Sequence, residues 1–142
     1  ATVTGTVRSF DAPSQDRIEA ALRDAATGMA LVHGVEVEVT YHRYYPATVN
    51  SAVEVQVALQ AAEVAGLTAG VASRPAFTSE DFAFMLRERP GAYLWLGQGV
   101  GEHPLHHPSY DFNDDALPHG VRWFCAVAEL ALASQVSAPA TR

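Results

Sequence analysis

Two adjacent histidines, His106 and His107, lie between Pro104 and Pro108, and they are the residues best suited to chemistry. Histidine is a common metal ligand, and the flanking prolines restrict the backbone so that an imidazole can be held in one orientation. Three carboxylates that follow could orient such a ligand through hydrogen bonds: Asp111, Asp114 and Asp115. A zinc-type centre needs three or four ligands, and no HExxH or Cys-x-x-Cys pattern accompanies the pair. The segment therefore predicts one corner of a metal site completed elsewhere, or else ordinary loop polarity.

A second polar cluster, Ser79 and Glu80 followed by Asp81, precedes a short apolar stretch. Thr78 or Ser79 is suited to cap a helix that runs through Arg87, and acidic residues in a first helical turn are stabilised by the helix dipole. The same residues could line a site, because helix starts at strand ends in α/β sheets are common ligand positions. Both interpretations stay open on the residues alone.

Composition excludes several classes of protein. The formal net charge is −7 and the nine basic residues form no cluster, which argues against a nucleic-acid surface. No apolar stretch approaches the length of a membrane span, and no signal segment is recognisable. The single cysteine, Cys125, lies in an apolar run, so we expect a buried, inert thiol in a reducing compartment. The expected location is cytoplasmic, with neither nucleic acid nor membrane as a partner.

Hydrophobic periodicity predicts alternating strands and helices. Strands are expected over 3–10, 35–41, 71–73 and 91–97, the last buried on both faces. Helices are expected from a cap at Asp11 to about Val32, from Ser51 to about Ala65, from Thr78 or Ser79 to Arg87, and from Asp114 or Asp115 to Ala133. In the first helix the apolar face carries Ile18, Leu22 and Met29, with charged residues between them. This alternation predicts an α/β fold with a parallel-rich sheet.

The first fifty residues read strand, helix, strand, a unit that is too small to be stable alone. We expect this unit to belong to a larger sheet, completed either by further sequence or by a partner chain. The chain also begins at Ala1 without an initiator methionine. The expectation is therefore that the chain is a portion of a larger protein.

Four segments, in this order, are shared with a known family: GTVRSFD, YYPATVN, SEDFAF together with PGAYLWLG, and PLHHPSYDFNDDALPHGV. They resemble the C-terminal part of the dinuclear metal-dependent amidohydrolases, which include hippurate hydrolase, N-acyl-amino-acid hydrolases and relatives of aminoacylase and the zinc carboxypeptidases. The resemblance implies an α/β catalytic domain interrupted by a small α+β lid domain that mediates dimerisation. Residues 1–48 then correspond to the second half of the lid, 49–134 to the C-terminal part of the catalytic domain, and 135–142 to a disordered tail.

The resemblance also implies roles for individual residues. His106 matches the metal-binding histidine of the family, whereas His107 matches a position that is not a ligand. Asn50 matches a residue that contacts substrate, and Ser79 with Glu80 would form part of the wall of the site. The family's centre holds two divalent ions (zinc, manganese, cobalt or nickel). Its other ligands and its glutamate general base lie upstream in the family and have no counterpart here, so no catalytic residue is identified in this chain.

The implied activity is hydrolysis of the amide bond of N-acylated amino acids, with hippurate-like small molecules as substrates and a homodimer formed through the lid. This chain alone is expected to be inactive and to bind metal weakly, since one ligand cannot hold an ion. The alternative is a non-catalytic α/β dimerisation or binding module in which the edge of residues 35–41 pairs with a partner chain.

Overall fold

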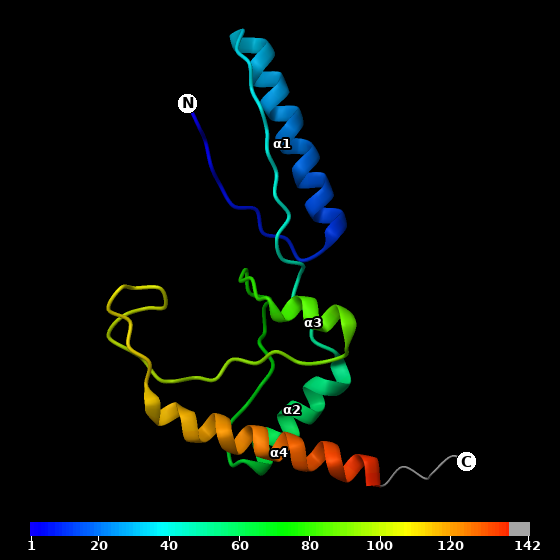
Figure 1. Cartoon of the computed structure of the whole chain (residues 1–142), viewed down its shortest axis with the longest axis vertical. Coiled ribbons are helices and arrows are strands. Elements are labelled where there is room, and N and C mark those ends of the chain that lie inside the picture. Colours follow the sequence, from blue (N-terminus) through cyan, green and yellow to red (C-terminus); the bar gives the residue numbers. More distant parts are fainter. Residues whose placement is uncertain (137–142) are drawn as a thin grey trace, which may run out of the picture. The chain divides into compact units, whose positions relative to one another are not determined.

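A computed structural model describes residues 1–136 of the chain, with side chains described up to Ala133. Its helices are α1 (Ala12–His33), α2 (Ala52–Val64), α3 (Phe82–Glu88), the 3-10 turn η1 (Asp114–Ala116) and α4 (Leu117–Val136), as Figure 1 shows. Helix α4 extends to Val136, into the segment 135–142 that was predicted to be a disordered tail, and that assignment stays a prediction. Residues 137–142 of that predicted tail lie outside the described part.

Helix α1 begins and ends where its capping residues predict. The carboxylate of Asp11 accepts a hydrogen bond of 2.6 Å from the Ser14 N–H, and a proline occupies the first turn. At the other end Gly34 adopts a left-handed conformation with φ of 64°, and its N–H bonds to the carbonyl of Ala30. The predicted start and stop of α1 are therefore confirmed.

The remaining helices are also confirmed, but two of their caps were predicted wrongly. Helix α3 starts at Phe82 behind Asp81, and not directly after Thr78 or Ser79. The final helix is introduced by η1, whose cap is Asn113: its side chain accepts from the Asp115 N–H at 3.1 Å. Asp114 and Asp115 thus lie inside the first turn instead of capping it, since the residue before them supplies the acceptor.

None of the four predicted strands is formed within residues 1–136. The prediction of an α/β sheet is therefore not met in the described residues, which form helices joined by coil. The physical reason is that a strand exists only when its backbone hydrogen bonds are made by a neighbouring strand. Residues 91–97 are also not buried on both faces: Trp95 is 62% exposed and Leu96 is 47% exposed.

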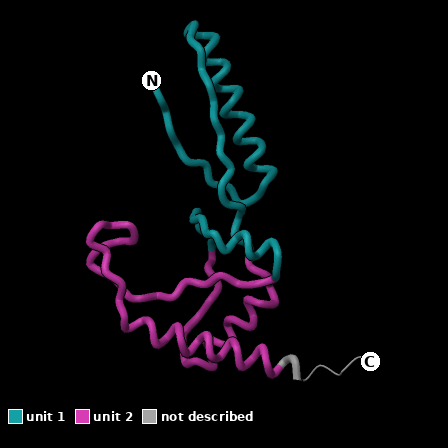
Figure 2. The backbone as a smooth tube through the Cα atoms, in the orientation of Figure 1, with its two compact units in different colours: residues 1–49, 74–89 teal, residues 50–73, 90–142 magenta. Residues whose placement is uncertain are grey.

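Two compact units can be distinguished, and Figure 2 colours them separately. Unit 1 comprises residues 1–49 and 74–89, and unit 2 comprises residues 50–73 and 90–142. The assignment of residues 1–48 to a lid and 49–134 to a catalytic domain stays a prediction.

In unit 1 the coil after α1 runs back alongside that helix (Figure 1) and is attached through the charged face of the helix. The guanidinium of Arg43 pairs with Asp16 at 2.6 Å and with Glu19 at 2.7 Å. Arg23 donates to the carbonyl of Val39 at 3.0 Å and also pairs with Glu19. No residue of α1 is fully buried: on its predicted apolar face Ile18 is half-buried, and Leu22 and Met29 are exposed. Ion pairs and an arginine–carbonyl hydrogen bond therefore attach this coil to α1.

In unit 2 the helices α2 and α4 pack against each other through small side chains. The buried residues at this contact are alanines, Ala58, Ala61 and Ala62 of α2 and Ala126 of α4. The indole N–H of Trp123 donates to the carbonyl of Ala58 at 3.0 Å. A core of methyl groups removes little apolar area from water and so contributes little free energy of folding.

The prediction that Cys125 is buried is wrong, because this residue is exposed on α4. The contact with α2 covers only the face of α4 that carries Trp123 and Ala126, and Phe124 beside the cysteine is 68% exposed. An apolar run within a helix therefore did not indicate that every side chain of the run is buried. Among residues 1–136, no helix is both long and apolar enough to cross a membrane.

Candidate functional site

The histidine segment of unit 2 folds into two consecutive tight turns. The His107 N–H donates to the carbonyl of Pro104 at 3.2 Å, and the Tyr110 N–H donates to the carbonyl of His107 at 2.9 Å. His106, the third residue of the first turn, has φ of 68°. It is the one described non-glycine residue with positive φ. Such a backbone is unfavourable for a residue with a Cβ, and strained residues of this kind concentrate at functional sites.

The two imidazoles have different surroundings. The ring of His107 stacks on that of His103 at 4.2 Å between centroids, and its Nδ1 accepts from the Ser109 N–H at 3.0 Å. This hydrogen bond places the proton of neutral His107 on Nε2. The ring of His106 is exposed and makes no hydrogen bond, ion pair or ring contact with any described residue. His107 therefore braces the turn, whereas His106 is available to an external group.

A polar clamp at Gln98 closes the base of this loop. The Gln98 side chain donates to the Tyr110 hydroxyl at 2.7 Å and accepts from the Asn113 N–H at 3.1 Å. The Asn113 side chain donates in turn to the Gln98 carbonyl at 3.0 Å. Sequence reasoning missed both residues. An asparagine ahead of two aspartates is a capping signal that could have indicated Asn113, whereas nothing in the sequence singles out Gln98.

Asn50, the predicted substrate contact, also lies in unit 2. Its Nδ2 donates to the carbonyl of Tyr93 at 2.9 Å and its Oδ1 accepts from the Tyr93 N–H at 2.8 Å. Next to it, the Ser51 N–H donates to the carbonyl of Gly91 at 2.9 Å. These bonds join the start of α2 to the segment that leads into the histidine loop. A carboxamide has two N–H donors, so Asn50 keeps one for a ligand.

Ser79 and Glu80 belong to unit 1, directly before α3. The Ser79 hydroxyl accepts from the guanidinium of Arg8 at 3.2 Å, and the backbone carbonyl of Glu80 accepts from the Ala83 N–H at 3.2 Å. Their side chains do not cap α3, whose capping position is Asp81. The role of both residues as part of a site wall stays a prediction.

The described residues do not by themselves fit a metal centre. No group of three or more histidine, cysteine, aspartate or glutamate side chains in residues 1–133 could hold an ion. His106 can supply one imidazole, and a stable tetrahedral site needs three or four ligands. Any metal at this loop would take its other ligands from groups outside the described residues.

These features define a clamped loop that presents one unengaged imidazole, and comparison with known proteins assigns the chain to a family. The profile of peptidase family M20/M25/M40 matches residues 3–130, nearly the whole chain. The chain belongs to this family, which confirms the resemblance to the amidohydrolases. A comparison with solved structures found none that matches.

Curated relatives are similar over most of the chain. The N-acetylcysteine deacetylase of Bacillus subtilis is 28% identical over 132 residues, which are 93% of this chain and 34% of the relative. The N-acetyldiaminopimelate deacetylase of Exiguobacterium sibiricum is 29% identical over 83% of this chain and 31% of its own length. The enzyme with the same name from Streptococcus thermophilus is 32% identical over 85% of this chain and 32% of its own length. The chain thus spans about a third of the length of the relatives that it matches.

Proposed function

We propose that this chain is part of a metal-dependent amidohydrolase that cleaves the amide bond of N-acylated amino acids. Membership of the M20 family supports the hydrolytic reaction, and two of the similar proteins are named as deacetylases of N-acetylated amino acids. Acetylated amino acids are therefore substrates to test beside hippurate. In residues 1–133 no group of three or more side chains could hold an ion, so the proposal places the general base and the other metal ligands outside this part of the chain.

The observation that carries this proposal is the state of His106. Its imidazole is exposed and unengaged, its backbone has φ of 68°, and it lies in a loop clamped by Gln98. Left-handed backbone at a non-glycine residue costs free energy, so its presence in a braced turn favours a functional reason for the geometry. In the proposal His106 is one ligand of the centre, while His107 holds the turn in shape.

The other predicted residues take binding roles. Asn50 would contact the substrate through its remaining Nδ2 hydrogen, and its bonds to Tyr93 would fix the direction of that donor. Ser79 and Glu80 would form part of the wall. In the same proposal residues 1–48 belong to a lid and 49–134 to a catalytic domain.

Activity of the intact natural protein is the direct test. We expect it to release free amino acid from N-acetylcysteine, N-acetyldiaminopimelate or hippurate when supplied with zinc, manganese, cobalt or nickel. The purified 142-residue chain, assayed in parallel, should be inactive. No hydrolysis of any of the three substrates by the intact protein with each metal would refute the proposal, as would full activity of the isolated chain.

We also propose that the chain forms a homodimer. Dimerisation would accompany the hydrolase function, and in the alternative function, a non-catalytic dimerisation module, it would be the role of the chain itself. It is supported by the coil of residues 35–41, where Val35 is 55% exposed and Val37 is 50% exposed beside acidic neighbours. An exposed segment with this alternation can pair edge to edge with a second copy. Glu36→Pro would remove one backbone donor and should shift the intact protein toward monomer in light scattering at several concentrations. Unchanged dimerisation would place the interface elsewhere.

A further inference from the structure

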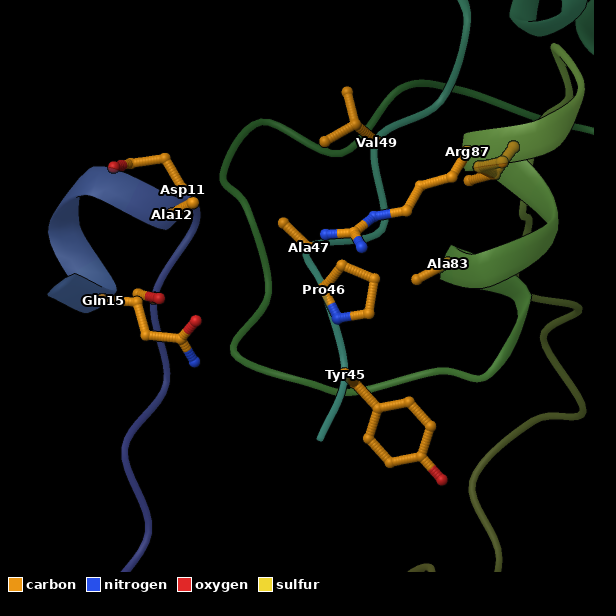
Figure 3. A pocket seen from close by; sticks show the side chains of 11 residues that line it. Asp11, Ala12, Gln15, Tyr45, Pro46, Ala47, Val49, Ala83 and Arg87 are labelled. Carbon is orange, nitrogen blue, oxygen red and sulfur yellow. The ribbon is translucent and has the colours of Figure 1, made fainter. Parts of the chain in front are cut away.

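Unit 1 contains a pocket that none of the roles above uses. Its volume is about 280 Å³, which is close to the lower end of small-molecule sites. All of its lining residues belong to unit 1, whereas the histidine loop belongs to unit 2. The pocket is thus a feature of its own, formed by the start of α1, the segment around Pro46 and helix α3 (Figure 3).

Arg87 supplies the positive charge of this pocket. Figure 3 shows its side chain reaching from α3 toward Pro46 and Ala47. The guanidinium forms no ion pair or hydrogen bond with any described residue, in contrast to that of Arg43, which has two carboxylate partners. A guanidinium presents parallel N–H donors that match a carboxylate in a two-bonded arrangement. An unpaired arginine on a pocket wall therefore favours an anionic ligand.

The one acidic residue of the lining does not compete for Arg87. The carboxylate of Asp11 turns toward α1 in Figure 3, where it accepts from the N–H and the hydroxyl of Ser14. These hydrogen bonds, the backbone one first, lower the pKa of Asp11, so it stays ionised and committed to the helix end. Its negative charge also disfavours a second anionic group in the ligand.

The rest of the wall mixes apolar and polar side chains. Tyr45, Pro46, Val49 and Leu86 supply its apolar part, and Ser9 and Gln15 add a hydroxyl and a carboxamide. The apolar part can bury the hydrocarbon portion of a ligand whose charged end meets the guanidinium.

We propose that this pocket binds small monocarboxylates that carry an apolar group, with Arg87 as the counter-ion of the carboxylate. The proposal is independent of the hydrolytic function, because it requires neither His106 nor a metal. Its ligand class is set by three properties of the pocket: one unpaired guanidinium, an apolar part of the wall around Pro46 and Leu86, and a volume suited to a small molecule.

The test is calorimetric titration of the intact natural protein with 4-methylpentanoate and with its uncharged analogue 4-methylpentanamide. A His106→Ala background separates this binding from any carboxylate held at the histidine loop. We expect saturable binding of the acid, and an affinity for the amide that is at least about tenfold lower. Binding of the acid should also shift the Val49 and Leu86 methyl resonances in NMR spectra. Arg87→Gln removes the charge-assisted hydrogen bonds and should lower the affinity for the acid about ten- to hundredfold.

Two further variants keep the outcome interpretable. Arg87→Lys retains the charge without the planar fork and should bind the acid with intermediate affinity, even if Arg87→Gln fails to fold. Arg89→Gln removes a nearby arginine that is not part of the lining and should leave affinity unchanged. The proposal is overturned by absence of saturable binding, by equal affinity for acid and amide, or by full affinity in folded Arg87→Gln.

Discussion

The carboxamide of Asn50 forms two hydrogen bonds with the backbone of Tyr93, at 2.9 Å and 2.8 Å. In this arrangement a side chain takes the place of a neighbouring strand, because it satisfies both the N–H and the carbonyl of one residue. The pairing is extended by the bond between Ser51 and Gly91. A residue proposed to contact substrate is therefore also a structural link within unit 2, and the two roles can be separated by experiment.

Replacing Asn50 by alanine should lower the free energy of unfolding of the intact protein by about 1–3 kcal/mol, because two backbone groups of Tyr93 lose their partner. Chemical denaturation measures this change. Gln56→Ala, at an exposed position in the middle of α2, is the matched control and should be nearly neutral. A raised KM with unchanged stability would show that Asn50 contacts substrate and that the link to Tyr93 is dispensable.

The two histidines of the loop should differ in metal content. His106→Ala in the intact protein should lose most of the bound metal and activity, because the unengaged imidazole is removed. His107→Ala removes the ring that stacks on His103, so it should retain most of the metal with a looser loop. Elemental analysis of both purified variants measures the difference, and the reverse order would assign the ligand to His107.

The backbone of His106 allows a second, independent measurement. At φ of 68° a glycine is unstrained, whereas alanine carries the same Cβ penalty as histidine. His106→Gly should therefore be more stable than His106→Ala by about 1 kcal/mol in thermal or chemical unfolding. The same comparison at Ser109, which has no positive φ, should favour alanine or be neutral. Equal stability of both His106 variants would mean that the turn does not need the left-handed conformation.

Acid should release the coil of residues 39–43 from α1. Hydrogen bonds from Arg23, and then from Arg43, lower the pKa of Glu19 below its ordinary value of 4.5. A carboxyl group whose pKa is lowered on folding stabilises the folded state above the unfolded pKa, and this contribution is lost as pH falls through the folded pKa. The Nε–H resonance of Arg43, which donates to Glu19, should therefore keep its position in NMR spectra at pH values above 4.5 and shift on further acidification. Glu19→Gln should abolish most of this pH dependence, and an identical profile in that variant would show that Glu19 does not control it.

The contact of α2 with α4 depends on small side chains. Ala61 is fully buried, so Ala61→Leu should lower the free energy of unfolding by about 1–3 kcal/mol through overpacking. Ala52→Leu, at an exposed position in the first turn of the same helix, is the control and should cost little. A stabilising effect of Ala61→Leu would indicate that the helices can separate without loss.

The helices could be predicted from the sequence because their signals are local. Asp11, Gly34 and the spacing of apolar residues act within a few positions of the chain, and the structure uses the first two as caps. The strands could not be predicted in the same way. A segment such as 35–41 has the alternation of a strand, but a ladder needs backbone partners from another segment, and within residues 1–136 none is paired in this way.

Burial also depended on contacts that no local pattern encodes. The apolar run around Cys125 predicted a buried thiol, yet α2 covers only the side of α4 that carries Trp123 and Ala126, and the cysteine is exposed. Likewise no local pattern showed that Asp16 and Glu19 of α1 would hold the coil through Arg43.

The sequence by itself determined the helices with their approximate ends, the family of the chain and the choice of His106 as the candidate ligand. These follow from short-range propensities and from residue order along the chain. Only the tertiary structure decided that His106 has a left-handed backbone and an unengaged ring, that Gln98 and Asn113 clamp its loop, and that Arg87 lies unpaired on a pocket wall. The physical reason is that hydrogen bonds, strain and exposure depend on which distant segments meet, and such meetings are properties of the folded chain.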